Sequence, residues 1–132
     1  EDGMNADLAK TLRYGAGGAS MESAHTKTNL LIQAHVGRAA LPIADYYTDL
    51  RSVLEQTGRV TQALVDIAAD LGCLAASLHV MRLAQSMAQC LFADQPSTLT
   101  LPFLTPEHAE ALNAQGVDSL RALLRVAVRG GG

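Results

Sequence analysis

An unbroken helical pattern of apolar residues between Thr48 and Leu71 constrains this fold more than any other feature of the sequence. Apolar residues recur there every three or four positions, which is the spacing of one buried face on an α-helix. They are Leu50, Val53, Leu54, Val60, Leu64, Ile67, Ala68 and Leu71. Thr48 suits an N-cap, Asp49 suits the positive end of the helix dipole, and Gly72 suits a left-handed C-cap. The pattern predicts a helix of about 24 residues, the longest in the chain.

The segments around this helix also follow helical spacing, and none alternates like a β-strand. Helices are predicted over about residues 1–13, 23–39 and 74–92. Met4, Leu8 and Leu12 share one stripe of the first helix, and the glycine-rich stretch 14–20 breaks it. Pro42 is expected to stop the second helix. Together with residues 48–71, these segments predict a partial helical bundle over residues 1–95.

The residue pattern changes beyond residue 96, where two short helices are predicted. Thr105 caps the first, Pro106 takes its favoured first-turn position and Gly116 ends it. Asp118 is expected to cap the second. A miniature core is expected from Leu112, Val117, Leu120, Leu123 and Leu124. The predicted fold is all-α: a helical bundle followed by a small helix-loop-helix over residues 98–128.

Composition limits both the core and the functions of such a fold. The chain has no Trp, three Tyr and two Phe, so its core must be largely aliphatic. Its formal charge is −3, whereas proteins that coat nucleic acid are usually basic, because phosphate neutralisation supplies most of their affinity. We therefore expect this chain to bind RNA or DNA weakly alone, and to add a few contacts inside a channel built by other domains.

Residues that carry catalysis or bind metals are present but scattered. The four histidines lie on separate segments, and no Cys/His pair has the spacing of metal ligands. They are His25, His35, His79 and His108, of which His35 and His79 are expected to be half-buried hydrogen-bonding residues. Cys73 and Cys90 lie about 25 Å apart on a helix of 1.5 Å rise, too far for a disulfide. We predict no catalytic residue, no metal site and no cofactor in this chain.

The polar side of the 48–71 helix is the best candidate for a binding face. Ser52, Gln56, Arg59 and Gln62 recur there at helical spacing. Gln and Arg side chains can hydrogen-bond bases and phosphates, and Arg can also stack on a base. The spacing by itself favours an ordinary solvated face over a binding face. Gly58 costs about 1 kcal/mol relative to Ala inside a helix, and close approach by a neighbouring helix or a ligand backbone would explain its presence.

Three stretches together resemble a known family. They are "HTKTNLLIQAHVGRAALPIADYYTD", "VLEQTGRVTQALVDIAADLG" and "LAQSMAQ", and the likeness extends over roughly residues 1–124. They are similar to the Sec-sixty-three homology unit, which follows the ATPase domains of superfamily 2 helicases of the Ski-two-like group. That unit has a helical bundle, a helix-loop-helix and an immunoglobulin-like sandwich. The sandwich and the ATPase motifs have no counterpart in this chain.

The resemblance implies a role for the 48–71 helix. In related helicases one long bundle helix crosses the nucleic-acid channel as a ratchet while the motor domains open and close. By position, Gln56 and Arg59 would contact the strand, with Ser52 and Gln62 as weaker contacts. Archaeal relatives place an aromatic residue where this chain has Arg59, and a guanidinium can replace it by stacking or by a phosphate contact.

The resemblance also implies partners and leaves alternatives open. The parent protein would be an ATP-dependent helicase that uses ATP and Mg, in the nucleus or the cytoplasm. This chain would meet single-stranded RNA or DNA, the motor domains and other subunits of a complex, and no membrane. One alternative is a protein-interaction scaffold of a helicase cassette. Another is a translocation-associated protein of the endoplasmic reticulum that carries the same unit.

Overall fold

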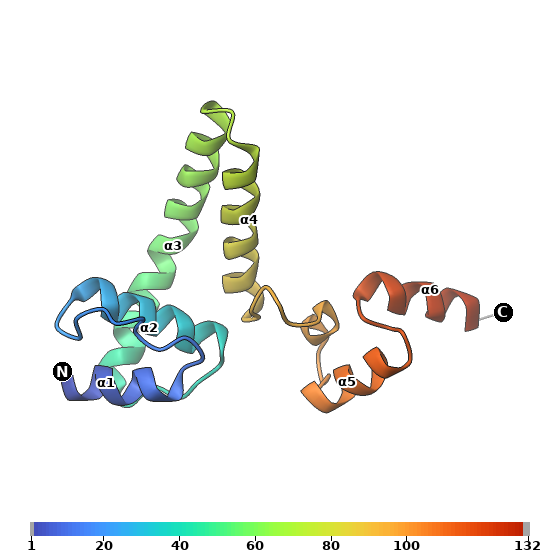
Figure 1. Ribbon diagram of the computed structural model, residues 1–132, viewed down its shortest axis with the longest axis horizontal. Helices are drawn as coiled ribbons and strands as arrows, with labels where there is room; N and C mark the ends of the chain where they lie inside the picture. Colours follow the sequence, from blue (N-terminus) through green and yellow to red (C-terminus); the bar gives the residue numbers. More distant parts are fainter. Residues whose placement is uncertain (1, 131–132) are drawn as a thin grey trace. The chain divides into compact units, whose positions relative to one another are not determined.

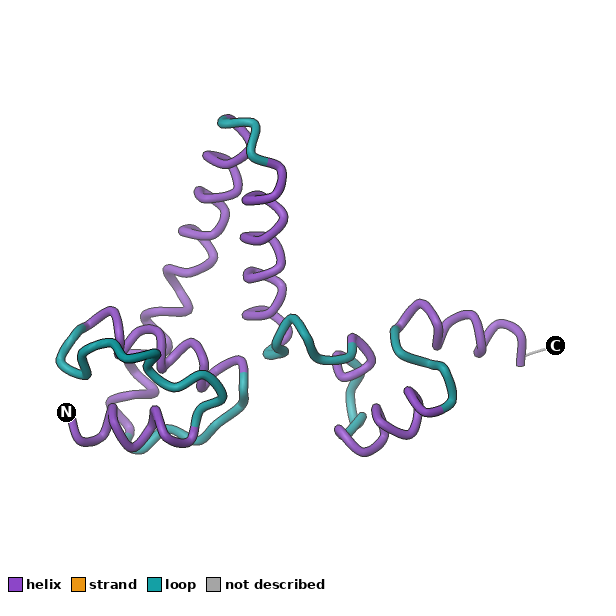
Figure 2. Tube along the Cα trace, viewed as in Figure 1, coloured by secondary structure: helices purple, strands orange, loops and turns teal. Residues whose placement is uncertain are grey.

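The computed structural model describes residues 2–130, and this range is helical without any β-strand, which confirms the predicted all-α class (Figures 1 and 2). The elements are α1 (Asp2–Thr11), α2 (Ala24–Val36), α3 (Ala44–Asp70), α4 (Leu74–Gln89), the 3₁₀ helix η1 (Ser97–Thr100), α5 (Pro106–Ala114) and α6 (Leu120–Gly130). They divide into two compact units: a first unit, Glu1–Phe92, and a second unit, Ala93–Gly132.

The core of the first unit joins α1, α2 and the first turn of α3. Its buried residues are Leu8, Leu12, Leu30, Leu31, Ala34, Leu41 and Tyr46. Asn5 is also buried: its amide donates to the Met21 carbonyl at 2.9 Å, and its side-chain oxygen accepts from the Tyr46 hydroxyl at 2.7 Å. Met4, expected in the apolar stripe of α1, is 39% exposed. The inward side of α1 therefore contains a buried polar residue, Asn5, which accepts a hydrogen bond from Tyr46.

Three helix boundaries differ from those predicted. α3 begins at Ala44 rather than at Thr48, so Asp45 is the acidic residue of its first turn, and Asp49 forms an ion pair with Lys27 of α2 at 2.7 Å. α2 ends at Val36, before Pro42 is reached, because Arg38 is left-handed at φ +53° and the Ala39 N–H bonds back to the Ala34 carbonyl. α4 ends at Gln89 because Cys90 adopts a left-handed conformation with φ +48°. The predicted end of α3 is confirmed, with Gly72 left-handed at φ +68°.

α3 and α4 form a long antiparallel hairpin (Figures 1 and 2). Small side chains line the contact: Thr61 and Ala68 of α3 and Ser77 of α4 are buried there. The hydroxyls of Thr61 and Ser77 donate to the carbonyls four residues earlier, at Thr57 and Cys73, so neither hydroxyl is buried without a partner. Much of the apolar surface remains exposed, including Val60, Leu64, Ile67, Leu71, Leu74, Leu78 and Met81. The prediction of one fully buried apolar face on α3 was therefore wrong beyond its first half.

The second unit contains the expected helix-loop-helix. Thr105 caps α5, with Pro106 in the first turn and His108 completing a reciprocal capping box. A hydrogen bond from the Thr105 side chain lowers the pKa of the Glu107 carboxyl in the same turn, assisted by the Glu107 backbone N–H. Ser119, not Asp118, caps α6: its hydroxyl accepts from the Ala122 N–H at 3.3 Å. The miniature core is smaller than predicted. Ala109, Val117 and Thr98 are buried, whereas Leu124 is exposed.

Candidate nucleic-acid interface

The predicted binding residues all lie on the exposed side of α3. Ser52, Gln56, Arg59 and Gln62 are solvent-exposed, whereas Thr61 faces α4. At about 100° per residue, the first three fall within about 60° of one another around the helix, and Gln62 lies about 80° from Ser52. The structure therefore brings Ser52, Gln56 and Arg59 into one row over two turns and leaves Gln62 at its edge.

The four side chains differ in how free they are to bind. Gln62 donates to the Asp66 carboxylate at 3.0 Å on the next turn. The neighbouring Arg51 is paired with Glu55 at 3.2 Å. Arg59 forms neither an ion pair nor a side-chain hydrogen bond within residues 2–130. Its guanidinium presents five N–H donors, so Arg59 is the side chain of this row best able to accept a phosphate or a base.

Gly58 lies beside Arg59 in an open environment. A Cβ built at Gly58 would meet no heavy atom within 4 Å, so no described neighbour crowds this turn. Packing by another helix of this chain, one expected reason for a mid-helix glycine, is therefore wrong. A cavity of about 290 Å³ lies next to Gly58 and is lined by both helices of the hairpin and by His35 of α2. The open surface here is compatible with close approach of a ligand backbone.

The substitution Gly58→Ala separates the two expected reasons for this glycine. We expect it to raise the free energy of unfolding of the first unit by about 0.5–1 kcal/mol, because Ala restricts the unfolded chain and meets no clash in α3. Urea denaturation would measure the change. A destabilised variant would show that Gly58 does have a close neighbour in the folded chain.

His35 ties α2 to the end of α4. Its Nε2 lies 2.9 Å from the Met87 carbonyl oxygen and 3.3 Å from the Cys90 sulfur. The expectation that His35 is half-buried and hydrogen-bonded is confirmed. His79 is exposed on α4, so the same expectation for His79 was wrong. His35 therefore has a structural role that accounts for its position without a ligand.

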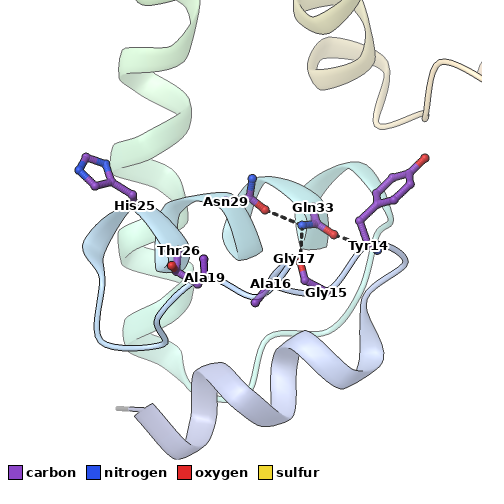
Figure 3. Close-up of a pocket in the computed structure, with 9 residues that line it drawn as sticks. All are labelled: Tyr14, Gly15, Ala16, Gly17, Ala19, His25, Thr26, Asn29 and Gln33. Atoms are coloured by element: carbon purple, nitrogen blue, oxygen red, sulfur yellow. Dashed lines mark hydrogen bonds between the residues drawn. The ribbon is translucent and has the colours of Figure 1, made fainter.

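The glycine-rich stretch and α2 enclose a second cavity, of about 390 Å³ (Figure 3). Gln33 donates to the Gly15 carbonyl at 2.9 Å and accepts from the Tyr14 N–H at 3.2 Å. Figure 3 shows the rings of Tyr14 and His25 pointing outward at its two ends. His25 is the one ionisable lining residue able to become a cation, so the lining offers amides and backbone rather than a charged site.

Neither metal ligands nor a membrane segment occurs in the part of the chain that the structure describes. No group of three or more His, Cys, Asp or Glu side chains there could hold an ion. Both cysteines are free thiols. Within the same residues, none of the helices combines the length and the apolar character needed to cross a bilayer.

The structure shows one exposed row of arginines that the sequence patterns did not identify as a candidate site. Arg121, Arg125 and Arg129 recur every four residues along α6 and are all exposed. That spacing can be read from the sequence, whereas the exposure of the helix beyond its first turn cannot.

The chain matches one protein family and several helicases of known name. The Sec63 Brl domain family matches residues 1–126. The chain is 41% identical over 127 residues to the DExH-box ATP-dependent RNA helicase DExH14 of Arabidopsis thaliana, covering 96% of this chain and 6% of that protein. It is 44% identical over 108 residues to human activating signal cointegrator 1 complex subunit 3, covering 82% of this chain and 5% of the relative.

A third relative is a helicase of a small nuclear ribonucleoprotein. The human U5 small nuclear ribonucleoprotein 200 kDa helicase is 32% identical over 120 residues, covering 91% of this chain and 6% of that protein. The stretches "EDGMNADLAKTL" and "LPIADYYTD" predict a closer likeness to the cointegrator-complex helicase than to the small nuclear ribonucleoprotein helicase, and the two human identities agree with that order. The chain spans 5–6% of the length of these relatives. It belongs to the Sec63 Brl domain family, in the form carried by Ski-two-like helicases.

Proposed function

We propose that this chain is an accessory C-terminal module of an ATP-dependent RNA or DNA helicase, where it lines the nucleic-acid channel and couples strand movement to the motor. The observation that carries the proposal is the exposed row on α3, in which Arg59 has no partner within residues 2–130. The parent protein would supply ATP and Mg through its motor domains. Its partners would be single-stranded nucleic acid and other subunits of a nuclear or cytoplasmic complex.

The setting of α3 suits a ratchet. At 27 residues and 1.5 Å rise, it is about 40 Å long. Its first half packs against α2 and it also packs along α4, so both neighbours anchor the helix while its polar side stays open. Gln56 and Arg59 lie in the middle of the helix. A strand moving past would exchange phosphate and base contacts with these two side chains, and Ser52 and Gln62 would add weaker contacts.

The test substitutes Gln56→Ala and Arg59→Ala together in the full-length parent. We expect strand unwinding to fall about tenfold, because a base or phosphate contact of this kind is worth about 1–3 kcal/mol. Both side chains are exposed, so thermal stability should not change. Unwinding and nucleic-acid-stimulated ATPase activity would be measured in parallel.

A matched control carries the same two changes on the other helix of the hairpin. Gln89→Ala with Arg82→Ala removes one exposed amide and one exposed guanidinium from α4 and should leave unwinding unchanged. If the α3 double variant is folded and unwinds as well as the parent, the ratchet role of α3 is wrong.

The alternative is a protein-interaction scaffold, favoured by the exposed apolar surface of the α3–α4 hairpin. Ile67, Leu71 and Leu74 are more than half exposed near its tip, and exposed apolar clusters of this kind often mark protein contacts. Purification of the tagged parent would test this role. A scaffold should retain its partner subunits after nuclease treatment and lose them when Leu71 and Leu74 are replaced by Ser.

A further inference from the structure

α6 is a basic helix whose charges are unpaired. Arg121, Arg125 and Arg129 follow one another every four residues, so they form one row along its length. None forms an ion pair within residues 2–130, and α6 contains no acidic residue. The whole chain has ten Lys and Arg against thirteen Asp and Glu, so outside α6 there remain seven against thirteen. This row is therefore a basic feature in an otherwise acidic chain.

An apolar stripe runs directly beside the arginine row. Leu124 is 65% exposed and Val128 is 79% exposed, one turn further along the same side. At about 100° per residue, both lie within about 100° of Arg125 around the helix. No residue of α6 is buried. One surface of the helix thus combines three cations with two aliphatic side chains that stay mostly open to solvent.

The anchoring of α6 is confined to its first turn. The Leu120 N–H donates to the Ser97 hydroxyl at 3.2 Å, and Ser119 caps the helix. Helices shorter than about 12–15 residues are marginal in water without tertiary contacts, and α6 has 11. A partner that covers Leu124 and Val128 would therefore order the helix as well as bind it.

We propose that α6 docks an acidic amphipathic helix of a protein partner. Such a helix offers carboxylates to the three guanidinium groups and aliphatic side chains to Leu124 and Val128 in one surface. A nucleic-acid backbone would satisfy the arginines but leave the aliphatic side chains uncovered. A membrane interface suits longer helices with aromatic residues, and α6 has none. This contact is independent of the strand path along α3.

The experiment uses the 132-residue chain and a fluorescent stapled peptide of about 18 residues, with Leu at heptad seam positions and Glu at the flanking positions. A second peptide has Lys in place of every Glu. Single-stranded oligouridine and vesicles containing phosphatidylserine are the other two probes. Binding is followed by fluorescence anisotropy or cosedimentation at physiological salt, and protection of the α6 amides by hydrogen exchange.

Two chain variants and one control locate the contact. Arg121, Arg125 and Arg129 all changed to Gln should weaken binding of the Glu peptide about tenfold, as should Leu124→Ser with Val128→Ser. Changing Arg38, Arg51 and Arg82 to Gln alters the net charge equally but should leave binding unchanged. Protection of residues 120–130 should rise when the Glu peptide is present.

The proposal is overturned by any of three results. The first is that the Glu peptide does not bind, or binds the triple α6 variant as tightly as the original chain. The second is that the Lys peptide binds as well as the Glu peptide. The third is that oligouridine or the vesicles bind more tightly than the Glu peptide at the same salt concentration, which would assign α6 to nucleic acid or to a lipid surface.

Discussion

Replacing Leu30 by Ala is expected to lower the free energy of unfolding of the first unit by about 3–4 kcal/mol. Leu30 is 0% exposed and lies at the centre of the cluster that joins α1, α2 and α3. The loss combines the hydrophobic transfer of the missing side chain with the cavity left behind. Domains of this size are typically stable by only about 5–15 kcal/mol, so the variant should unfold at markedly lower urea concentration.

The measurement can be confined to the first unit. All three tyrosines, Tyr14, Tyr46 and Tyr47, lie in that unit and the chain has no Trp, so tyrosine fluorescence reports its unfolding alone. Leu74→Ala is the matched control, because the same atoms are removed from a side chain that is 72% exposed. It should cost less than about 0.5 kcal/mol. Equal losses for the two variants would mean that the hairpin tip is buried in solution.

Helix number and type could be predicted because they depend on local signals. Each signal depends on only a few neighbouring residues. Examples are the three- and four-residue spacing in α3, the left-handed Gly72 and the Thr105–Pro106 start of α5. The start of α3 could not be predicted in the same way. Asp49 suits a first turn by local rules, but the helix begins one turn earlier, where Asp45 is the acidic residue of the first turn. Asp49 instead pairs with Lys27 of α2, a contact between two helices that local rules do not anticipate.

The candidate site was predictable in one respect and not in another. Periodicity places Ser52, Gln56 and Arg59 on the same side of a helix, and the structure agrees that they are exposed. Periodicity does not say which neighbour covers the opposite side. In the second half of α3 the contact with α4 runs through Thr61 and Ala68, while Leu64 and Ile67 stay open to solvent. Apolar residues at helical spacing thus overstate burial when only one helix packs against them.

Asn5 shows the same limit inside the core, and its replacement is the second large effect. A polar residue on an amphipathic helix is expected to face solvent, yet Asn5 is 3% exposed. Its side chain forms hydrogen bonds with two groups that lie far away in the sequence. One is the Met21 carbonyl, 16 residues on, and the other is the Tyr46 hydroxyl, 41 residues on. We expect Asn5→Ala to lower the free energy of unfolding by about 2–3 kcal/mol, because both buried hydrogen bonds are lost.

A double-mutant cycle with Tyr46→Phe tests whether these losses share one cause. Removing the hydroxyl alone should cost about 1 kcal/mol, and the double variant should cost less than the two changes added together, with a coupling of about 1 kcal/mol. Tyr47→Phe is the matched control, since its hydroxyl accepts from the Leu41 N–H at 3.2 Å and forms no hydrogen bond with Asn5, whose side chain bonds to Met21 and Tyr46. It should show no coupling to Asn5→Ala. Additive losses for Asn5 and Tyr46 would mean that the Asn5 amide acts through Met21 alone, so that α1 is joined to the loop before α2 and not to α3.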